Sequence, residues 1–353
     1  MKKILFIGLL LLIFIPKVEA IQAESYVVMD YDTGRILEGK NEDKEKLIAS
    51  TTKIMTAIIA LENGSLDSTI KVGEEVLKAY GSAIYLSLNE EISLKDLLYG
   101  LMLRSGNDAA IEIAYLVSGN MDNFVDLMNK KSYQLGMSHT KFINNHGLEN
   151  DKGEGNISTA YDMAILMRYA IKNETFRSII ATKNYTAKTS GKTYTWKNKN
   201  KLLFSYKNML GGKTGFTEKA RRTLVTASRK DEKTCIVVTL NDGNDFLDHK
   251  NLCESVFKNY ERVEVVNKDN LNIDKDPMKY YIENSLYALL KPDEIDKLSV
   301  KYEITHDSSD VGYVKVLLNN ELLTSARLYK REEEKSDKKE NFFVRFFKWV
   351  MAW

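Results

Sequence analysis

The stretch Ser50-Thr51-Thr52-Lys53 opens a predicted helix, whose later turns carry apolar residues at helical spacing and which is expected to end at Gly64. Residues three apart share a helix face, so Lys53 would stand one turn above Ser50. A serine hydroxyl is a poor nucleophile at neutral pH unless a proton acceptor lies within hydrogen-bond reach. A lysine surrounded by apolar groups and other cations loses its proton more readily. The spacing therefore predicts a nucleophile beside its own base, although a helix-capping serine and a solvated lysine would give the same short pattern.

Two further short motifs follow in order along the chain. They are Ser105-Gly106-Asn107 and Lys213-Thr214-Gly215. S-x-x-K alone recurs by chance in many chains, whereas S-x-x-K with S-D-N and K-T-G is the motif set of β-lactamases and penicillin-binding proteins. This chain has Gly106 where that set has aspartate. The three motifs in this order are much more specific than any one of them.

Longer sequence segments around the motifs extend the resemblance over roughly residues 25–260. They are Leu47–Ala49 before Ser50, Leu98–Arg104 before Ser105, Leu135–Met137, Asn145–Leu148, Ser158–Met163 and Gly212–Thr217. On these residues the chain resembles the D-alanyl-D-alanine carboxypeptidases among the low-molecular-mass penicillin-binding proteins. The resemblance implies removal of the terminal D-alanine from peptidoglycan stem peptides without a cofactor, and acylation by β-lactam antibiotics.

Four residues would form the catalytic group by this resemblance. Ser50 would attack the carbonyl between two D-alanine residues, and Lys53 would accept its proton. Free D-alanine would leave an acyl-enzyme that water then hydrolyses. Ser105 would relay a proton to the leaving amine, and Asn107 would hold the substrate amide.

A second group would bind the substrate. Lys213 and Thr214 would supply the cation and the hydroxyl that a terminal carboxylate needs, and Gly215 would let the backbone approach closely. An oxyanion hole needs two converging N–H donors, and the resemblance assigns these to the backbones of Ser50 and Phe216.

Some positions depart from the family pattern and put substrate preference and turnover rate in question. Ala220-Arg221-Arg222-Thr223 stands where the family commonly has Ala-Gly-x-Cys, so Arg221 would be strained if that glycine served a left-handed backbone. Asn156-Ile157 replaces the usual His-Tyr, and Asn145 replaces a proline.

Three other functions stay open beside the carboxypeptidase. A β-lactamase shares the motifs, but fast deacylation needs an added water-activating base that the sequence does not reveal. A transpeptidase would pass the acyl group to an amine. The fourth possibility is a non-catalytic protein that binds the cell wall and keeps a relic of the site. Only Arg221-Arg222, which departs from the family pattern, suggests it.

Strand patterns stand at both ends of residues 21–262, the expected peptidase domain, with helical patterns between them. A hairpin is expected where Asp32-Thr33-Gly34 joins two apolar runs. Helices are expected over 94–103, 108–117, 121–135, 159–171 and 246–260, and strands over 213–216, 223–227 and 234–240. This order predicts an α/β fold of the α+β type, with one antiparallel sheet flanked by helices. The resembling family has this β-lactamase/transpeptidase-like architecture, with its site between the sheet edge and the helices.

Residues 263–330 alternate between apolar and polar side chains, which is typical of half-buried strands and predicts a small β domain without chemistry of its own. The tail, residues 331–353, combines a charged linker with a segment that would be an amphipathic helix on a membrane surface, too short to span it. The alternative is a helix packed on protein.

Residues 1–20 have the basic start, apolar run and small final residue of a signal peptide cleaved after Ala20. An uncleaved anchor would need a longer apolar stretch. We therefore expect an exported protein, held peripherally on the outer face of the cytoplasmic membrane.

The composition and the spacing of particular residues argue against nucleic-acid binding, a metal site and a disulfide. The 51 basic and 49 acidic residues create no global field for nucleic acid. The four histidines, His139, His146, His249 and His306, lack metal-ligand spacing, so no metal site is expected, and His146 is interpreted as a structural residue of its loop. Cys235 and Cys253 both lie in segments typical of the core, which favours buried thiols over a disulfide.

Overall fold

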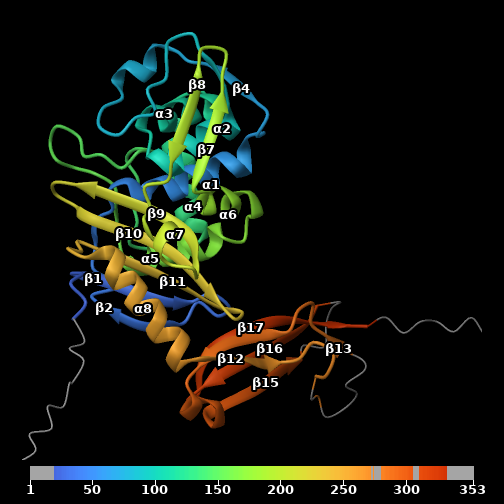
Figure 1. Cartoon of the computed structure of the whole chain (residues 1–353). Helices are drawn as coiled ribbons and strands as arrows, with labels where there is room; N and C mark the ends of the chain where they lie inside the picture. Colours follow the sequence, from blue (N-terminus) through green and yellow to red (C-terminus); the bar gives the residue numbers. More distant parts are fainter. Residues whose placement is uncertain (1–19, 272, 274–279, 305–309, 332–353) are drawn as a thin grey trace, which may run out of the picture. The chain divides into compact units, whose positions relative to one another are not determined.

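The computed structural model describes residues 20–271, 273, 280–304 and 310–331 (Figure 1). Contacts divide the described chain into two units. The first comprises residues up to Val28, Glu38–Ser228 and Ile236–Cys253, and the second comprises Met29–Leu37, Arg229–Cys235 and the residues from Glu254 onward. The expected signal peptide and the expected terminal helix both lie outside the described residues. Within the described part, no helix is long and apolar enough to cross a membrane.

A five-stranded sheet carries the order β2-β1-β11-β10-β9. Its strands are β1 (Ser25–Asp30), β2 (Ile36–Lys40), β9 (Met209–Thr217), β10 (Arg221–Lys230) and β11 (Lys233–Leu240). β1 and β2 form the predicted hairpin, with Gly34 at φ 82° donating its N–H to the carbonyl of Asp30. Because β1 lies beside β11, the sheet joins distant parts of the chain, as predicted. β9 is an edge strand that pairs antiparallel with β10.

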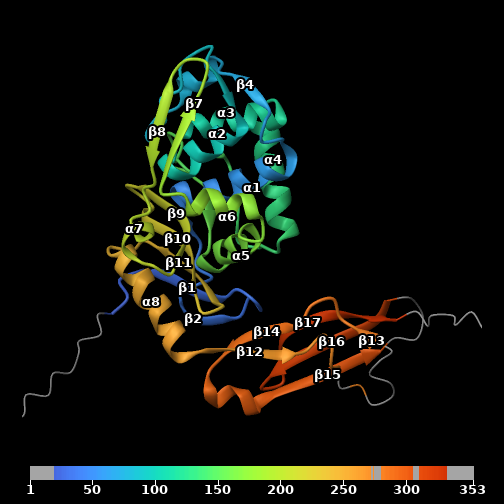
Figure 2. The ribbon, with the colours of Figure 1, turned by 45° about the vertical axis from the view of Figure 1, so that its right-hand side comes forward.

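Helices cover both faces of this sheet (Figures 1 and 2). The helical segments are η1 (Ala49–Thr52), α1 (Lys53–Asn63), α2 (Leu94–Tyr99), η3 (Gly100–Arg104), α3 (Asn107–Ser118), α4 (Met121–Gln134), α5 (Ala160–Ala170), α6 (Glu174–Ala181), α7 (Leu202–Ser205) and α8 (Asp245–Asn259). The predicted helices are confirmed, whereas α6 and α7 were not anticipated. Every residue from Lys53 to Ala60 is buried, so α1 runs through the centre of the helical part.

α8 lies on the opposite face of the sheet from α5 and α6 (Figure 2). The fully buried ring of His249 fixes it there, with Nδ1 2.7 Å from Thr226 Oγ1 and Nε2 3.1 Å from Thr239 Oγ1. Burial lowers the pKa of His249 to about 3, so the ring is neutral at physiological pH.

Short strand pairs border the helices. They are β3 (Lys46–Leu47) with β6 (Ile157–Ser158), β4 (Thr69–Lys71) with β5 (Glu91–Ser93), and β7 (Asn184–Lys188) with β8 (Thr193–Lys197). The β7–β8 hairpin is held by ring stacking, since Tyr185 lies 3.6 Å from Tyr99 of α2 between ring centroids and also stacks on Trp196. It therefore gives the chain that follows it, from Asn198 to β9, a fixed starting point.

The C-terminal residues form β structure, as predicted. The strands are β12 (Glu261–Val266), β13 (Tyr280–Tyr281), β14 (Leu286–Leu290), β15 (Leu298–Ile304), β16 (Asp310–Leu318) and β17 (Glu321–Lys330). β13, β17, β16 and β15 make a four-stranded sheet, and β12 pairs with β14. Val314, Val316 and Leu328 form the centre of its apolar core. The domain boundary expected between residues 262 and 263 stays a prediction.

Candidate active site

Ser50 and Lys53 meet where η1 continues into α1. Lys53 is fully buried, and its Nζ lies 3.1 Å from Ser50 Oγ. The same Nζ donates to Asn107 Oδ1 at 2.7 Å and to the carbonyl of His146 at 2.5 Å. Asn107 is held in this orientation because its Nδ2 donates to the carbonyl of Tyr80 at 2.6 Å. The side chains of Ser50 and Lys53 thus lie within hydrogen-bond distance, as the helical spacing predicts, and their catalytic roles stay a prediction.

The surroundings of Lys53 favour its neutral form. Burial lowers its pKa well below the ordinary value, and the nearby charges of Lys213 and Lys199 lower it further. A neutral amine has two N–H groups, and Asn107 Oδ1 and the His146 carbonyl accept both of them. The lone pair is then left for the third neighbour, the hydroxyl of Ser50.

Ser105 and Asn107 stand at the junction of η3 and α3. Ser105 has a left-handed backbone (φ 64°), and Asn107 begins α3 with its N–H bonded to the carbonyl of Ser82 at 2.7 Å. A Cβ at Gly106 would lie 2.9 Å from Asp108 Oδ1 and 3.1 Å from Ile84 Cγ2. This turn therefore leaves little room for the aspartate of the S-D-N motif.

β9 provides the facing wall. Lys213 is 1% exposed and donates to Ser105 Oγ at 3.1 Å and to the carbonyl of Thr214 at 2.6 Å. Burial, and then the charge of Lys199, lower the pKa of Lys213 to about 7. A Cβ at Gly215 would lie 3.0 Å from the backbone nitrogen of Ser50 and would collide with Thr223 Oγ1. Glycine is thus required for η1 and β9 to approach so closely.

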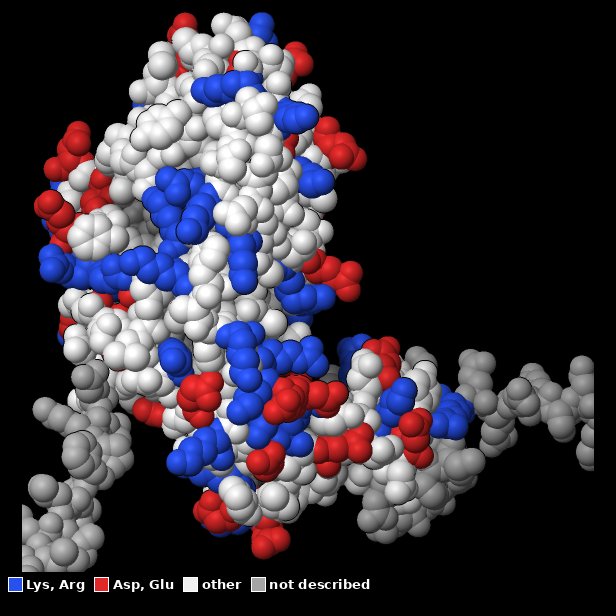
Figure 3. All heavy atoms as spheres, in the orientation of Figure 1, with Lys and Arg blue, Asp and Glu red and all other residues white. Residues whose placement is uncertain are grey.

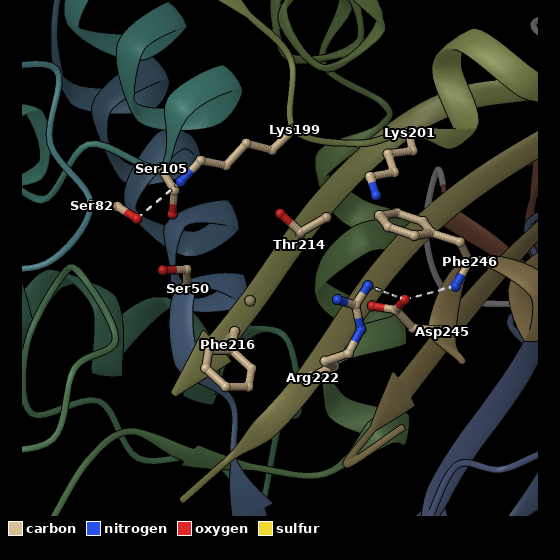
Figure 4. Close-up of a pocket in the computed structure, with 11 residues that line it drawn as sticks. Ser50, Ser82, Ser105, Lys199, Lys201, Thr214, Phe216, Arg222, Asp245 and Phe246 are labelled. Atoms are coloured by element: carbon tan, nitrogen blue, oxygen red, sulfur yellow. Dashed lines mark hydrogen bonds and ion pairs between the residues drawn. The ribbon is translucent and has the colours of Figure 1, made fainter. Parts of the chain in front are cut away.

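A cleft of about 360 Å³ opens between these walls (Figure 4). Five of the predicted site residues line it, and Lys53, Asn107 and Lys213 lie buried behind its surface. The lining residues are Ser50, Ser82, Ser105, Lys199, Lys201, Thr214, Gly215, Phe216, Arg222, Asp245 and Phe246. Sequence reasoning missed Ser82, Lys199, Lys201, Asp245 and Phe246, because no spacing rule connects these positions to β9. Figure 3 shows Lys and Arg side chains gathered around β9 and the chain that leads into it.

The residues that depart from the family pattern make specific contacts or adopt a special backbone conformation. Arg221 adopts φ 60°, so the strain expected for a residue at this glycine position is present. Arg222 forms an ion pair with Asp245, with Nη2 2.5 Å from Oδ1. Asn156 is buried and donates to Thr52 Oγ1 at 2.9 Å, and Asn145 donates to the carbonyl of Ala110, so both anchor backbone near α1 and α3.

His146 belongs to the loop that contacts Lys53. Its Nδ1 accepts the N–H of Leu148 at 3.1 Å, and burial lowers the pKa of the ring to about 3. A neutral ring with a local backbone bond agrees with the structural role expected for it. Cys235 and Cys253 are buried thiols that do not form a disulfide with each other, as the sequence favoured. Within the described ranges, no three His, Cys, Asp or Glu side chains are placed to hold a metal ion.

Comparison with known proteins places this geometry in a family. The family model described as D-alanyl-D-alanine carboxypeptidase matches residues 13–244. D-alanyl-D-alanine carboxypeptidase DacF of Bacillus subtilis is 36% identical over 251 residues, which cover 66% of this chain and 64% of that protein. The structure of penicillin binding protein 5 from Haemophilus influenzae, 27% identical, matches with a TM-score of 0.74 over 89% of this chain and 98% of that one. A mutant of the Streptomyces K15 DD-transpeptidase, 33% identical, matches with a TM-score of 0.64 over 68% and 99% of the two chains. The chain therefore belongs to the D-alanyl-D-alanine carboxypeptidase family of serine peptidases.

Proposed function

We propose that this protein is a serine-type D-alanyl-D-alanine carboxypeptidase that removes the terminal D-alanine from peptidoglycan stem peptides. One observation carries the proposal: the amine of the fully buried Lys53 lies 3.1 Å from the hydroxyl of Ser50 and also contacts Asn107 Oδ1 and the carbonyl of His146. Family membership supports the same reaction. The matched region spans 64% of the B. subtilis relative, so the activity is proposed for this chain rather than transferred to it.

Acylation begins when the lone pair of Lys53 takes the proton of Ser50. The freed oxygen attacks the penultimate carbonyl, and the oxygen of that carbonyl gains negative charge. The backbone N–H groups of Ser50 and Phe216 are the donors for this charge. The short approach of Gly215 to the Ser50 nitrogen supports that assignment, because it brings the two backbone segments together.

The leaving amine needs a proton when the C–N bond breaks. Ser105 accepts a hydrogen bond from Lys213, whose pKa of about 7 lets it hold or release a proton at neutral pH. Ser105 therefore relays the proton to the departing D-alanine, and Asn107 keeps Lys53 aligned with Ser50 while also facing the substrate amide. Water then hydrolyses the acyl-enzyme.

Fast penicillin hydrolysis is disfavoured by the residues that line the cleft. In the described part of the chain, the only carboxylate in this lining is that of Asp245, and it accepts from Arg222 and from the N–H of Phe246. A carboxylate engaged in this way is a poor base for a hydrolytic water. We therefore expect a long-lived penicillin adduct.

The test uses purified wild-type protein and Ser50→Ala, each incubated with a peptide ending in D-Ala-D-Ala and with a labelled penicillin. Release of D-alanine and a stable penicillin adduct, both absent from Ser50→Ala, support the proposal. Rapid penicillin turnover would identify a β-lactamase, and the absence of any adduct would identify a relic site.

Transpeptidation is the second candidate activity, favoured by the similarity to the Streptomyces DD-transpeptidase. Both reactions share the acyl-enzyme and differ in the acceptor. Adding an amine acceptor to the peptide assay separates them, since a transpeptidase forms the transfer product in place of the hydrolysed peptide.

We further propose that the protein is exported through residues 1–20 and held peripherally on the outer face of the cytoplasmic membrane through residues 331–353. The basic start and apolar run support the first part, and the separation of aromatic and polar residues in the tail supports the second. Deleting residues 338–353 should release the protein from membranes, and a deletion variant that stays bound would contradict the anchor.

A further inference from the structure

We propose that Arg222, assisted by Lys201, binds the free C-terminal carboxylate of the substrate and so restricts the enzyme to chain ends. This inference rests on the proposed carboxypeptidase function. It assigns the task to two side chains outside the K-T-G motif, brought together over the ring of Phe246 at one end of the cleft (Figure 4).

Lys213 is poorly suited to hold the carboxylate by itself. The residue is 1% exposed, and its amine donates to Ser105 Oγ and to the carbonyl of Thr214. With a pKa of about 7, it carries a full positive charge only part of the time at neutral pH. Lys199 is also committed, because its Nζ donates to Ser82 Oγ at 3.0 Å. A carboxylate in this cleft needs a cation that stays charged.

Arg222 meets that requirement. A guanidinium stays protonated at all physiological pH values and has five N–H donors. The bond to Asp245 Oδ1 uses Nη2, and Asp245 is itself 3% exposed and bonded to the N–H of Phe246. The carboxylate of Asp245 thus holds the guanidinium of Arg222 at the cleft, and further N–H groups of the guanidinium are left to bind a ligand.

Lys201 adds a second positive charge at the same place. Its Nζ lies 6.0 Å from the centroid of the Phe246 ring, and the guanidinium carbon of Arg222 lies 5.3 Å from that centroid. Both cations contact one aromatic ring, which keeps them together and covers one side of each from water. Among the described residues that line the cleft there are three cations, Lys199, Lys201 and Arg222, and one carboxylate, that of Asp245. The excess charge suits an anionic ligand.

The strand register brings Arg222 within reach of the substrate's last residue. Arg222 pairs with Phe216 across β9 and β10, so their Cα atoms are about 5 Å apart and their side chains point to the same face. The scissile carbonyl is held at the backbone of Phe216 in the proposed reaction. The terminal carboxylate is one residue further along, about 3.5 Å of chain. Thr214, two residues before Phe216 on the same face, lies between Ser50 and the cation pair in Figure 4 and supplies the hydroxyl.

The test compares a peptide ending in D-Ala-D-Ala with the same peptide ending in D-alaninamide. Binding is measured by calorimetry in the Ser50→Ala background, so the result does not depend on turnover. We expect Arg222→Gln to weaken binding of the acid by about 10- to 100-fold, the range for a charge-assisted hydrogen bond. Lys201→Gln should weaken it by a smaller factor. The affinity for the amide should change less than threefold in both variants.

Three matched variants separate the loss of the Arg222 charge from a general disturbance of the structure. Arg221→Gln removes a neighbouring arginine that does not line the cleft, and it should leave both affinities unchanged. Arg222→Lys should keep part of the preference for the acid. Arg222→Gln alone would leave the buried carboxylate of Asp245 without its ion-pair partner, so a double variant with Asp245→Asn removes that charge as well. If the double variant folds and still binds the acid peptide weakly, the loss of affinity is due to the missing cation.

Two results would overturn the inference. One is an equal loss of affinity for acid and amide in Arg222→Gln, and the other is an unchanged preference for the acid in both glutamine variants. Failure of the proposed function would look different, because wild-type protein would then release no D-alanine whatever the outcome of these binding measurements.

Discussion

Replacing Glu112 with glutamine tests the electrostatics of the helical core. Glu112 lies on α3 one turn after Asp108, is fully buried, and makes no hydrogen bond of normal geometry with the described residues. Burial raises its pKa from 4.5 to about 8, and the charges of Glu75 and Asp108 add to the effect. The folded protein therefore keeps a proton on Glu112 at neutral pH.

The sign and size of the effect follow from proton linkage. The unfolded chain releases this proton near pH 4.5, whereas the folded chain holds it up to about pH 8. The contribution of Glu112 to the free energy of unfolding should consequently be complete below about pH 4.5, fall as the pH rises between these values, and be lost above about pH 8. One pKa unit corresponds to about 1.4 kcal/mol, so the full difference is at most about 5 kcal/mol. Between pH 5.5 and 8 it is about 3 kcal/mol.

The assay is urea unfolding of wild type and Glu112→Gln at pH 5.5 and pH 8. Glutamine cannot ionise, so its advantage over wild type should grow by about 3 kcal/mol from the lower pH to the higher. Glu174→Gln, on an exposed position of α6, is the matched control and should show no such growth. A constant difference between wild type and Glu112→Gln at both pH values would refute the reasoning.

Three further changes probe the site. Gly215→Ala should lower the rate of penicillin acylation by about 100-fold, because the new Cβ must push β9 away from Ser50; acylation at the wild-type rate would contradict this close packing. Arg221→Gly should raise the free energy of unfolding by about 1 kcal/mol in urea titrations, since it relieves a left-handed arginine at φ 60°, and a loss of stability would show that no strain is stored there. Lys213→Met should move the acid limb of the acylation rate to higher pH, because the charge of Lys213 helps to lower the pKa of Lys53. An unmoved limb would contradict this coupling and leave burial and the charge of Lys199 as the causes of the shift.

The sequence predicted the parts of the site that obey a local spacing rule. Ser50 and Lys53 are three residues apart on one continuous helical segment, whereas Ser105 and Lys213 were assigned to the same site by the resemblance to the penicillin-binding proteins. The hairpin of β1 and β2, the helices α1 to α5 and the three strands β9 to β11 likewise follow from local patterns of turn residues and periodicity.

The missed features depend on long-range contacts. Lys199 and Lys201 follow the β7–β8 hairpin on a segment anchored by long-range contacts, in which the N–H of Lys199 donates to the carbonyl of Leu103 at 3.1 Å. Asp245 and Phe246 come from the start of α8, which the sheet brings beside β10. Arg222 was recognised as a departure from the family, but its ion pair with Asp245 is a contact across 23 residues that no local pattern encodes.

The central claim is that a neutral Lys53 activates Ser50. The measurement that tests it most directly is the second-order rate of acylation by a labelled penicillin as a function of pH, with the adduct located on Ser50 by mass spectrometry. Because the pKa of Lys53 lies well below its usual 10.5, the rate should rise along an acid limb and level off well below pH 10. A rate that keeps rising to a limb near pH 10.5 would contradict the claim, since Lys53 would then be an ordinary charged lysine.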